Sequence, residues 1–446
     1  MGKKKQIILE NIRLMKLVHG GQCIGQNEHG KAVFVWGGLP GELVDIRVTK
    51  KKSSYLEGIV TQVHEASDDR IEPVEPLSYL STSPWQIMTI DAENAAKHSI
   101  LTEAFEREGV EDLLFEPFVA SASGRTVRVD GFIPAPGTIR NPEGVSYMGY
   151  RNKNEFGFWG ADDGLHLAHY VRGTNGKQMV TESKLAHESI NQAARDVRDE
   201  LNRLDVWAGK LKTVLIRSSQ AGEAVAALFI KEEINMSDFT LPNSLKGIDV
   251  YYSDPQSPAS VPTKKLYSLG DITLSDTING KEISYDVMSF FQVNIPIFEQ
   301  ALGQIKAHSS GTSRVVDMYS GVGAIGIAVG ADVLIDSDDA NIAMAKQNVT
   351  GTDTTVVHAT AETALDHIKS GDTLIVDPPR AGLHKDVVQR ILDIQPSKII
   401  YLSCNPSTQA RDVKLLLEKY KVVHAQGFNF FPRTPHIESL FILELK

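Results

Sequence analysis

From about residue 296 to the end, the sequence alternates short apolar runs with longer segments of helical period. Short apolar runs are typical of buried strands, and the longer amphipathic segments are typical of helices. Their alternation predicts an α/β fold, a doubly wound sheet with a ligand at the carboxyl ends of its strands. The expected strands are 315–318, 333–335, 355–357, 373–376, 398–403, 422–428 and 438–445, and the expected helices are 340–348, 362–368, 384–392 and 406–420.

A glycine-rich turn, 317–323 (DMYSGVG), follows the first of these strands. Glycine lets a ligand approach the backbone closely, and the helix that follows offers free N–H groups. The spacing D-x-x-x-G-x-G, with Gly321 as its first glycine, favours S-adenosylmethionine over a dinucleotide, whose usual form is G-x-G-x-x-G. A tight strand–helix turn without a ligand is the alternative reading.

Two acids end strands of the expected sheet. Asp336 follows the second strand, where a carboxylate can accept hydrogen bonds from ribose hydroxyls, although a helix cap is equally possible and Asp338 would serve as well. Asp377 ends the strand 373–376 and precedes two prolines, which predicts a rigid carboxylate beside the cofactor. Base methyltransferases use related Asp-Pro-Pro motifs to hold the target base.

Cys404 lies between the end of a strand and a helix that starts at Pro406. A helix N-terminus favours a thiolate, so Cys404 is a candidate nucleophile. Addition of a thiolate to carbon 6 of uracil makes carbon 5 nucleophilic, which divides one difficult methyl transfer into easier steps. Glu438 precedes the last strand and can remove the proton from carbon 5. Taken alone, Glu438 could equally be a strand-edge charge, and His436 beside it is as compatible with a structural or RNA-facing role as with a catalytic one.

The N-terminal segment differs in charge and pattern from the rest. Residues 1–65 carry ten Lys or Arg and six Asp or Glu, whereas the whole chain has a net charge of −10. Five short runs punctuated by glycine and proline predict a small OB-type barrel, which could bind phosphates. Residues 66–285 are expected to form a central α+β domain with a helix at 91–109, and residues 286–446 the catalytic domain. A helix near 181–204 and antiparallel strands are expected in the central domain.

Cysteine content and hydropathy bear on location. Cys23 and Cys404 are too few for a disulfide scaffold or for a metal site made of cysteines. No apolar run is long enough to span a membrane, and the first residues lack the pattern of a signal peptide. A cytoplasmic protein without a metal or an obligate protein partner is therefore expected.

Taken together, these motifs resemble the RNA uracil-5-methyltransferase family, whose members bind S-adenosylmethionine and RNA and often carry an N-terminal TRAM barrel. The resemblance is carried by four segments along the chain: FFQVN at 290–294, DPPRAGL at 377–383, SCNP at 403–406 with ARD at 410–412, and HIES at 436–439. It implies that Cys404 is the nucleophile and Glu438 the base. It also implies that Phe290 stacks on the uracil. The cofactor contacts that it implies are Gln292, Tyr319, Asp336, Thr360 and Asp377, of which Asp377 would also orient the base.

The chain departs from the family in three places. Many relatives hold a [4Fe–4S] cluster with four cysteines, but the equivalent stretch 78–86 (SYLSTSPWQ) has none, so no iron–sulfur cluster is expected. Asp336 stands where glutamate is usual, and Thr360 replaces a more common Asp or Asn. These two changes could weaken cofactor binding.

Four functions are compatible with at least some of these motifs. The leading one is methylation of carbon 5 of uracil in RNA, with 23S rRNA favoured and tRNA as the alternative. A non-catalytic RNA-binding protein would not need Cys404, Asp377 and Glu438 together. RNA cytosine-5 methyltransferases carry a cysteine directly after the paired prolines, where this chain has Arg380. A small-molecule methyltransferase would leave the basic barrel unexplained.

Overall fold

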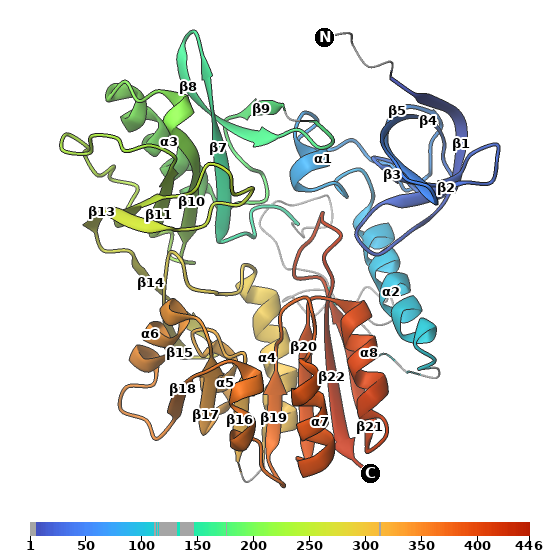
Figure 1. Ribbon diagram of the computed structural model, residues 1–446, viewed down its shortest axis with the longest axis vertical. Coiled ribbons are helices and arrows are strands. Elements are labelled where there is room, and N and C mark those ends of the chain that lie inside the picture. Colours follow the sequence, from blue (N-terminus) through green and yellow to red (C-terminus); the bar gives the residue numbers. More distant parts are fainter. Residues whose placement is uncertain are drawn as a thin grey trace.

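The computed structural model describes residues 6–110, 113, 115, 132–133, 147–174, 176–311 and 314–446. The turns expected at 134–137 and at Asn175 lie outside these residues. Figure 1 shows three sheets: a barrel at the upper right, a second sheet at the upper left, and a larger sheet flanked by helices below them.

The N-terminal barrel has five strands, and alternate side chains of each strand fill its interior. It is closed, with the strand order β1-β2-β3-β5-β4. Val33 and Val35 of one strand and Val44 and Ile46 of another are fully buried, as the period of two requires. The predicted OB-type barrel is confirmed. Its strands are β1 (Ile8–Leu17), β2 (Cys23–Gln26), β3 (Ala32–Trp36), β4 (Leu43–Lys51) and β5 (Tyr55–Glu65).

The central sheet has seven strands in the order β13-β12-β11-β10-β7-β8-β9, and α3 (Glu188–Arg203) packs on one face through its buried apolar side. Its strands are β7 (Lys153–Ala161), β8 (Gly164–Tyr170), β9 (Lys177–Val180), β10 (Leu211–Ser218), β11 (Ala224–Ile230), β12 (Gly247–Tyr252) and β13 (Lys264–Gly270). The expectation of antiparallel strands is wrong for one pair, because β11 and β12 run parallel. The connection 231–246 is long enough for the crossover that a parallel pair requires.

The third sheet has the order β18-β17-β16-β19-β20-β22-β21-β6. The pairs from β18 to β20 are parallel, and β22 runs antiparallel to both of its neighbours. Every residue of β16 and β19 is buried, because helices cover both faces. The predicted doubly wound fold is confirmed. The strands are β16 (Val315–Met318), β17 (Val333–Asp336), β18 (Thr355–His358), β19 (Thr373–Val376), β20 (Lys398–Ser403), β21 (Tyr420–Phe428), β22 (Glu438–Leu445) and β6 (Phe132–Ile133).

Helices connect most of these strands: α4 (Ile295–Ser309), α5 (Ala324–Val329), α6 (Asp339–Asn348), α7 (Lys385–Ile394) and α8 (Pro406–Leu416). The helix expected at 362–368 is instead two 3₁₀ turns, η2 (Ala361–Thr363) and η3 (Leu365–His367). The hydroxyl of Thr363 donates a 2.9 Å hydrogen bond to the carbonyl of Thr360, a local bond that competes with continuation of a helix. Helix α8 ends before residue 420, since Tyr420 is buried in β21.

Helix α2 (Ile90–Arg107) follows the barrel and the short α1 (Tyr79–Thr82) in the chain, but it packs against α8 of the third sheet. Its Phe105 ring stacks on Phe441 of β22, with 4.4 Å between the ring centroids. The hairpin β14 (Thr273–Ile278) and β15 (Lys281–Asp286) leads from the central sheet to α4. None of the helices in the described part of the chain has the length and apolar character that crossing a membrane requires.

Candidate active site

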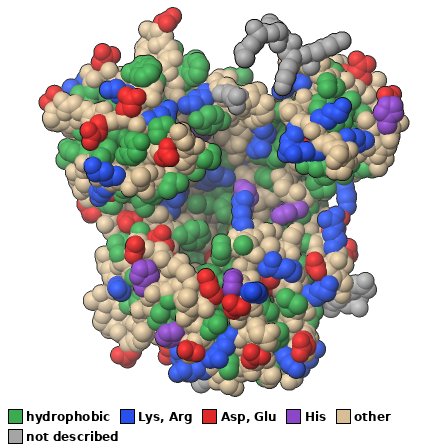
Figure 2. Space-filling model, viewed as in Figure 1, with side chains coloured by type: hydrophobic (Ala, Val, Ile, Leu, Met, Phe, Trp, Pro, Cys, Tyr) green, Lys and Arg blue, Asp and Glu red, His purple; other side chains and the backbone are tan. Residues whose placement is uncertain are grey.

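A cavity of about 710 Å³ lies at the carboxyl ends of the parallel strands, within the size range of ligand pockets. Figure 2 shows that the surface is hollowed where the three sheets meet, with Lys, Arg and His side chains in the hollow. All nine residues that the sequence proposes for the site line this cavity: Phe290, Gln292, Tyr319, Gly321, Asp336, Thr360, Asp377, Cys404 and Glu438. The structure thus brings the candidate cofactor, base and catalytic residues together.

The turn after β16 has a left-handed backbone at three positions: Tyr319 (φ 67°), Gly321 (φ 57°) and Gly323 (φ 89°). A tyrosine in this conformation is strained, and such residues gather at functional sites. A Cβ on Gly321 would lie 3.5 Å from the ring of Phe290, so glycine keeps the space between them open. A Cβ on Gly323 would approach Leu334 to 2.8 Å, so glycine there allows α5 to pack on β17.

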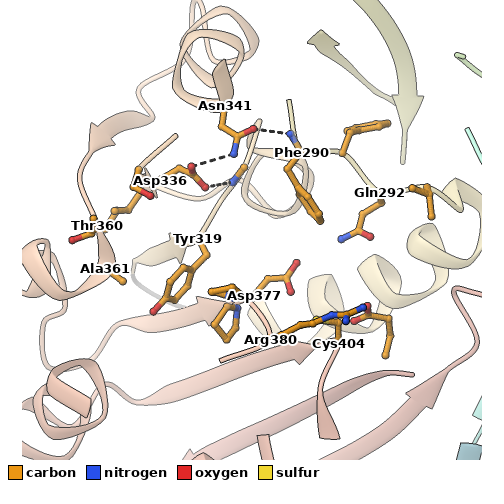
Figure 3. A pocket seen from close by; sticks show the side chains of 18 of the residues that line it. Phe290, Gln292, Tyr319, Asp336, Asn341, Thr360, Ala361, Asp377, Arg380 and Cys404 are labelled. Atoms are coloured by element: carbon orange, nitrogen blue, oxygen red, sulfur yellow. Dashed lines mark hydrogen bonds between the residues drawn. The ribbon is translucent and has the colours of Figure 1, made fainter. Parts of the chain in front are cut away.

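Asp336 is fixed on one side of the cavity (Figure 3). Its Oδ2 accepts a 2.9 Å hydrogen bond from the N–H of Gly321, and its Oδ1 accepts one of 3.1 Å from the side chain of Asn341. Asn341 in turn accepts a 2.8 Å bond from the N–H of Phe290. Asp338, which caps α6, takes the role that the sequence left open between the two acids, and Asp336 faces the cavity.

Asn341 couples the glycine turn, through Asp336, to the segment 290–293, and no sequence motif indicates this role. We expect Asn341→Ala to lower the affinity for S-adenosylhomocysteine by about tenfold, since the carboxylate of Asp336 loses a partner and the partly buried N–H of Phe290 loses its acceptor, each at about 0.5–1.5 kcal/mol. Isothermal titration calorimetry measures this change. Asn191→Ala removes a buried amide of α3 that bonds both backbone groups of Ser183 outside the cavity, and it is the matched control. Equal loss in both variants would contradict the prediction.

The remaining candidate cofactor residues surround the same space. Figure 3 shows Thr360 beside Asp336, and Gln292 near Phe290. The carbonyl of Gln292 accepts a 2.8 Å bond from Asn152 of the central region, which fixes the backbone there. The ring of Phe290 is 58% exposed, so it is available for stacking.

Cys404 follows β20 and precedes the N-cap of α8, as the sequence predicts. Asn405 accepts the N–H of Ser407 as the cap and donates a 2.7 Å bond to the carbonyl of Arg380. The hydroxyl of Thr408 donates to the same carbonyl at 3.2 Å. The start of α8 therefore holds the Asp-Pro-Pro-Arg loop next to the cysteine.

Asp412 of α8 fixes the other end of this loop. One of its oxygens accepts 2.8 Å bonds from the N–H of Leu383 and the hydroxyl of Tyr401. Arg411 donates to the carbonyl of Ala381 at 3.1 Å. Gly382 has φ 79°, and a Cβ there would collide with Asp412. The segments 377–383 and 403–412, far apart in the sequence, thus form one rigid unit.

The surroundings of the two acids of the site raise their pKa values. Burial raises the pKa of Asp377 to about 7. Burial and then the negative charge of Asp377 raise the pKa of Glu438 well above its usual range, against the opposing charge of Arg380. Carboxyl groups with raised pKa values are suited to proton transfer near neutral pH.

The same surroundings act against a thiolate. Burial and then the charges of Glu438 and Asp377 raise the pKa of Cys404 to about 12. The expectation that the helix N-terminus yields a thiolate is therefore wrong for the ligand-free site, because desolvation and two carboxylates outweigh the helix dipole. A nucleophilic role for Cys404 would require its deprotonation when a substrate binds.

The raised pKa predicts slow alkylation. Because only the thiolate reacts, the thiolate fraction of Cys404 at neutral pH should be about a thousandfold below that of a thiol of pKa 9. The rate with iodoacetamide should keep rising above pH 9, and Asp377→Asn should increase it at pH 9 by removing a negative charge. Mass mapping separates Cys404 from Cys23, which is buried in the barrel and serves as the unlabelled control. A plateau below pH 9 would contradict the prediction.

Three further residues line the cavity and were not singled out by sequence reasoning as site residues. Arg151 comes from the central region, where no motif indicates it. Arg380 follows the prolines, and its guanidinium lies 3.2 Å from Nδ1 of His436. Burial and then the charge of Arg380 lower the pKa of His436 to about 4, so the imidazole is neutral at pH 7. In the sequence, only the position of His436 in the segment HIES (436–439) indicates a place in the site.

Two segments of the chain match models of known protein families. Residues 360–446 match the family model described as tRNA (Uracil-5-)-methyltransferase, and residues 9–61 match that of the TRAM domain. The predicted resemblance to the RNA uracil-5-methyltransferase family is confirmed. The first match takes in Cys404, Glu438 and Asp377, and the second coincides with the barrel.

Relatives that match along the whole chain are named as RNA methyltransferases. The chain is 29% identical over 450 residues to an uncharacterized RNA methyltransferase of Aquifex aeolicus, with 97% of each chain covered. It is 25% identical over 466 residues to one of Thermotoga maritima, with 98% of this chain and 99% of that one covered. The curated relatives are therefore RNA methyltransferases.

A solved structure shares the fold over the whole length. It is the Pyrococcus abyssi tRNA (uracil-54, C5)-methyltransferase in complex with S-adenosyl-L-homocysteine. The TM-score is 0.73 at 21% identity, and the match covers 97% of this chain and 100% of that one. The chain therefore shares the fold of this protein over its whole length.

Proposed function

We propose that this protein transfers a methyl group from S-adenosylmethionine to carbon 5 of a uracil in RNA, with Cys404 as nucleophile and Glu438 as base. One observation supports this above the others. A cysteine and two carboxyl groups of raised pKa line the same cavity as a glycine turn and a strand-end aspartate. A protein that only binds RNA has no use for this combination.

The residues present fit the cofactor. Oδ1 of Asp336 accepts two hydrogen bonds, but Oδ2 accepts only one and keeps a lone pair, so it can receive a ribose hydroxyl. Gly321 leaves open the space that a Cβ would enter. Tyr319 and Thr360 line the adjoining wall. S-adenosylmethionine, when bound, supplies an electrophilic methyl group on its sulfonium.

The chemistry assigned to the chain is a sequence of bond and proton changes. The sulfur of Cys404 bonds to carbon 6 of the uracil, and its proton passes to Asp377, whose pKa of about 7 suits it as acceptor. Carbon 5 takes the methyl group, and Glu438 then removes the remaining proton from carbon 5. The Sγ–C6 bond breaks, the C5–C6 double bond returns, the thiolate takes back the proton held by Asp377, and Glu438 releases the proton from carbon 5 to solvent.

Two substrate classes follow from different observations. In the family that the chain resembles, a barrel of this type accompanies ribosomal-RNA members and some tRNA members, and 23S rRNA is the first candidate. The fold neighbour acts on uracil 54 of tRNA, which favours tRNA as the second. In either RNA the base must be unpaired or extruded from its stack to reach the cavity.

The test has two parts. Purified protein should form an adduct with 5-fluorouridine RNA that survives denaturing electrophoresis, since fluorine at carbon 5 prevents the last step; a protein that only binds RNA forms none. Mass spectrometry of 5-methyluridine in 23S rRNA and tRNA, from cells with and without the gene, then identifies the substrate. Loss of 5-methylcytidine instead would overturn the proposal in favour of the cytosine reaction.

A further inference from the structure

The loop 429–437 joins β21 to β22 and rises from the third sheet toward the centre of the molecule (Figure 1). Four of its backbone groups, the carbonyls of residues 430, 431 and 432 and the N–H of residue 433, are hydrogen-bonded by side chains from earlier parts of the chain, at 2.9–3.0 Å. The side chains, in loop order, are Asn294, Lys97, Tyr150 and Glu93. The loop is thus held from outside its own sheet.

Glu93 and Lys97 are a buried ion pair on α2. Both side chains are 0% exposed, and their charged atoms are 2.8 Å apart. Lys97 also donates to Oδ1 of Asn429 (2.6 Å) and to the carbonyl of Phe431 (3.0 Å), so its three donors all have partners. Glu93 accepts from Asn429 (3.0 Å) and from the N–H of Arg433 (2.9 Å).

A buried ion pair is weak evidence for stability, because desolvation offsets much of its attraction. A hydrophobic pair of similar volume would serve the fold about as well. The geometry of this pair indicates another role, because both ions use their remaining hydrogen-bonding capacity on the loop.

The loop contributes Phe431 and His436 to the wall of the cavity. The two rings meet edge to face, with 5.5 Å between centroids, and His436 lies 3.2 Å from Arg380 of the Asp-Pro-Pro-Arg loop. A chain of contacts therefore runs from Lys97 through Phe431 and His436 to the side of the cavity that holds Cys404. Asp336 and Asn341, on the cofactor side, take no part in it.

We propose that Glu93 and Lys97 are positioning residues for the target base. They hold Phe431 and His436 in the cavity wall, so that the base lies against Cys404, and they do not affect cofactor binding. The inference rests on the proposed function, from which it takes the identity of the reacting group.

The test variant is Glu93→Leu/Lys97→Met. It removes both charges of the pair at once and keeps side chains of similar length. Arg433, whose guanidinium lies 3.9 Å from Glu93, keeps its 2.6 Å hydrogen bond to the carbonyl of Met88. Glu93→Gln/Lys97→Met is the graded companion, since glutamine can still bond the N–H of Arg433 and Asn429. The matched control, Glu103→Gln/Arg107→Met, removes an exposed Glu–Arg pair from the same helix.

The expected result is a split between two measurements. The rate of adduct formation with saturating 5-fluorouridine RNA should fall about tenfold or more in the apolar variant, because small misplacements of reacting groups have effects of this size. The fall should be smaller in the glutamine companion and absent in the control. The affinity for S-adenosylhomocysteine should stay within about twofold in all three, by calorimetry on protein whose thermal unfolding shows it to be folded.

Two results would overturn the inference. One is an adduct rate near that of the wild type in a folded variant, and the other is a parallel loss of S-adenosylhomocysteine affinity, which marks a general structural role. If the apolar variant does not fold, the glutamine companion decides by the same comparison. Absence of an adduct in the wild type would instead refute the proposed function itself.

Discussion

Cys404→Ser is expected to abolish 5-methyluridine formation, with turnover reduced by about 10⁴-fold or more, as for other covalent enzymes that lose their nucleophile. A hydroxyl is a far weaker nucleophile than a thiolate, and the step that activates carbon 5 depends on the new bond to carbon 6. The measurement is methyl transfer from labelled S-adenosylmethionine to RNA. Because residue 404 directly precedes the N-cap of α8 and is only half-buried, the substitution should leave folding intact.

Cys23→Ser is the matched control for this change. Cys23 is fully buried in the barrel and lies outside the cavity, so its replacement should affect the free energy of unfolding while turnover per folded molecule stays near that of the wild type. Turnover retained by Cys404→Ser would remove the basis of the proposed chemistry.

Glu438→Gln is expected to act after the methyl transfer. It should lower turnover by about 10²- to 10⁴-fold, the usual contribution of a general base. Because Cys404 stays in place, the variant should accumulate a covalent complex with ordinary RNA, methylated at carbon 5, which wild-type protein releases. Denaturing electrophoresis and mass spectrometry of the trapped nucleotide measure this directly.

Glu444→Gln, at the other end of the same strand, is the control. Glu444 pairs with Lys398 at 3.3 Å, far along β22 from the cavity, so turnover and release should stay unchanged. A Glu438→Gln variant that forms no covalent complex would place its role before the addition of the thiol rather than after it.

Much of the third sheet could be predicted because its strands are short, apolar and buried on both faces. The ranges 315–318, 373–376 and 398–403 agree with the expected strands, since covered parallel strands leave an uninterrupted apolar pattern. The positions of Asp336, Asp377 and Cys404 follow from the same regularity, because the carboxyl ends of parallel strands meet at one edge. The two 3₁₀ turns after β18 could not be foreseen, since alanines at helical spacing suit either form.

The parts that could not be predicted depend on contacts between distant segments. Arg151 reaches the cavity from the central region, and nothing in its neighbourhood announces a site. Asn341 looks like an ordinary residue in the first turn of a helix until its two hydrogen bonds are seen. The raised pKa of Cys404 could not be predicted, because the sequence shows the helix that follows Cys404 but not the two carboxylates that the fold places beside it.

Helix α2 has a consequence for how such proteins can be divided and recombined. In the gene it separates the barrel from the central sheet, yet its Phe105 covers Phe441 and its ion pair anchors the last loop. A fragment cut at residue 286 would carry every reacting group and still lack the brace that aligns them. A chimera that takes its C-terminal domain from a homologue should therefore be active only when α2 comes from the same homologue. These two segments, separated in the sequence, form one functional unit.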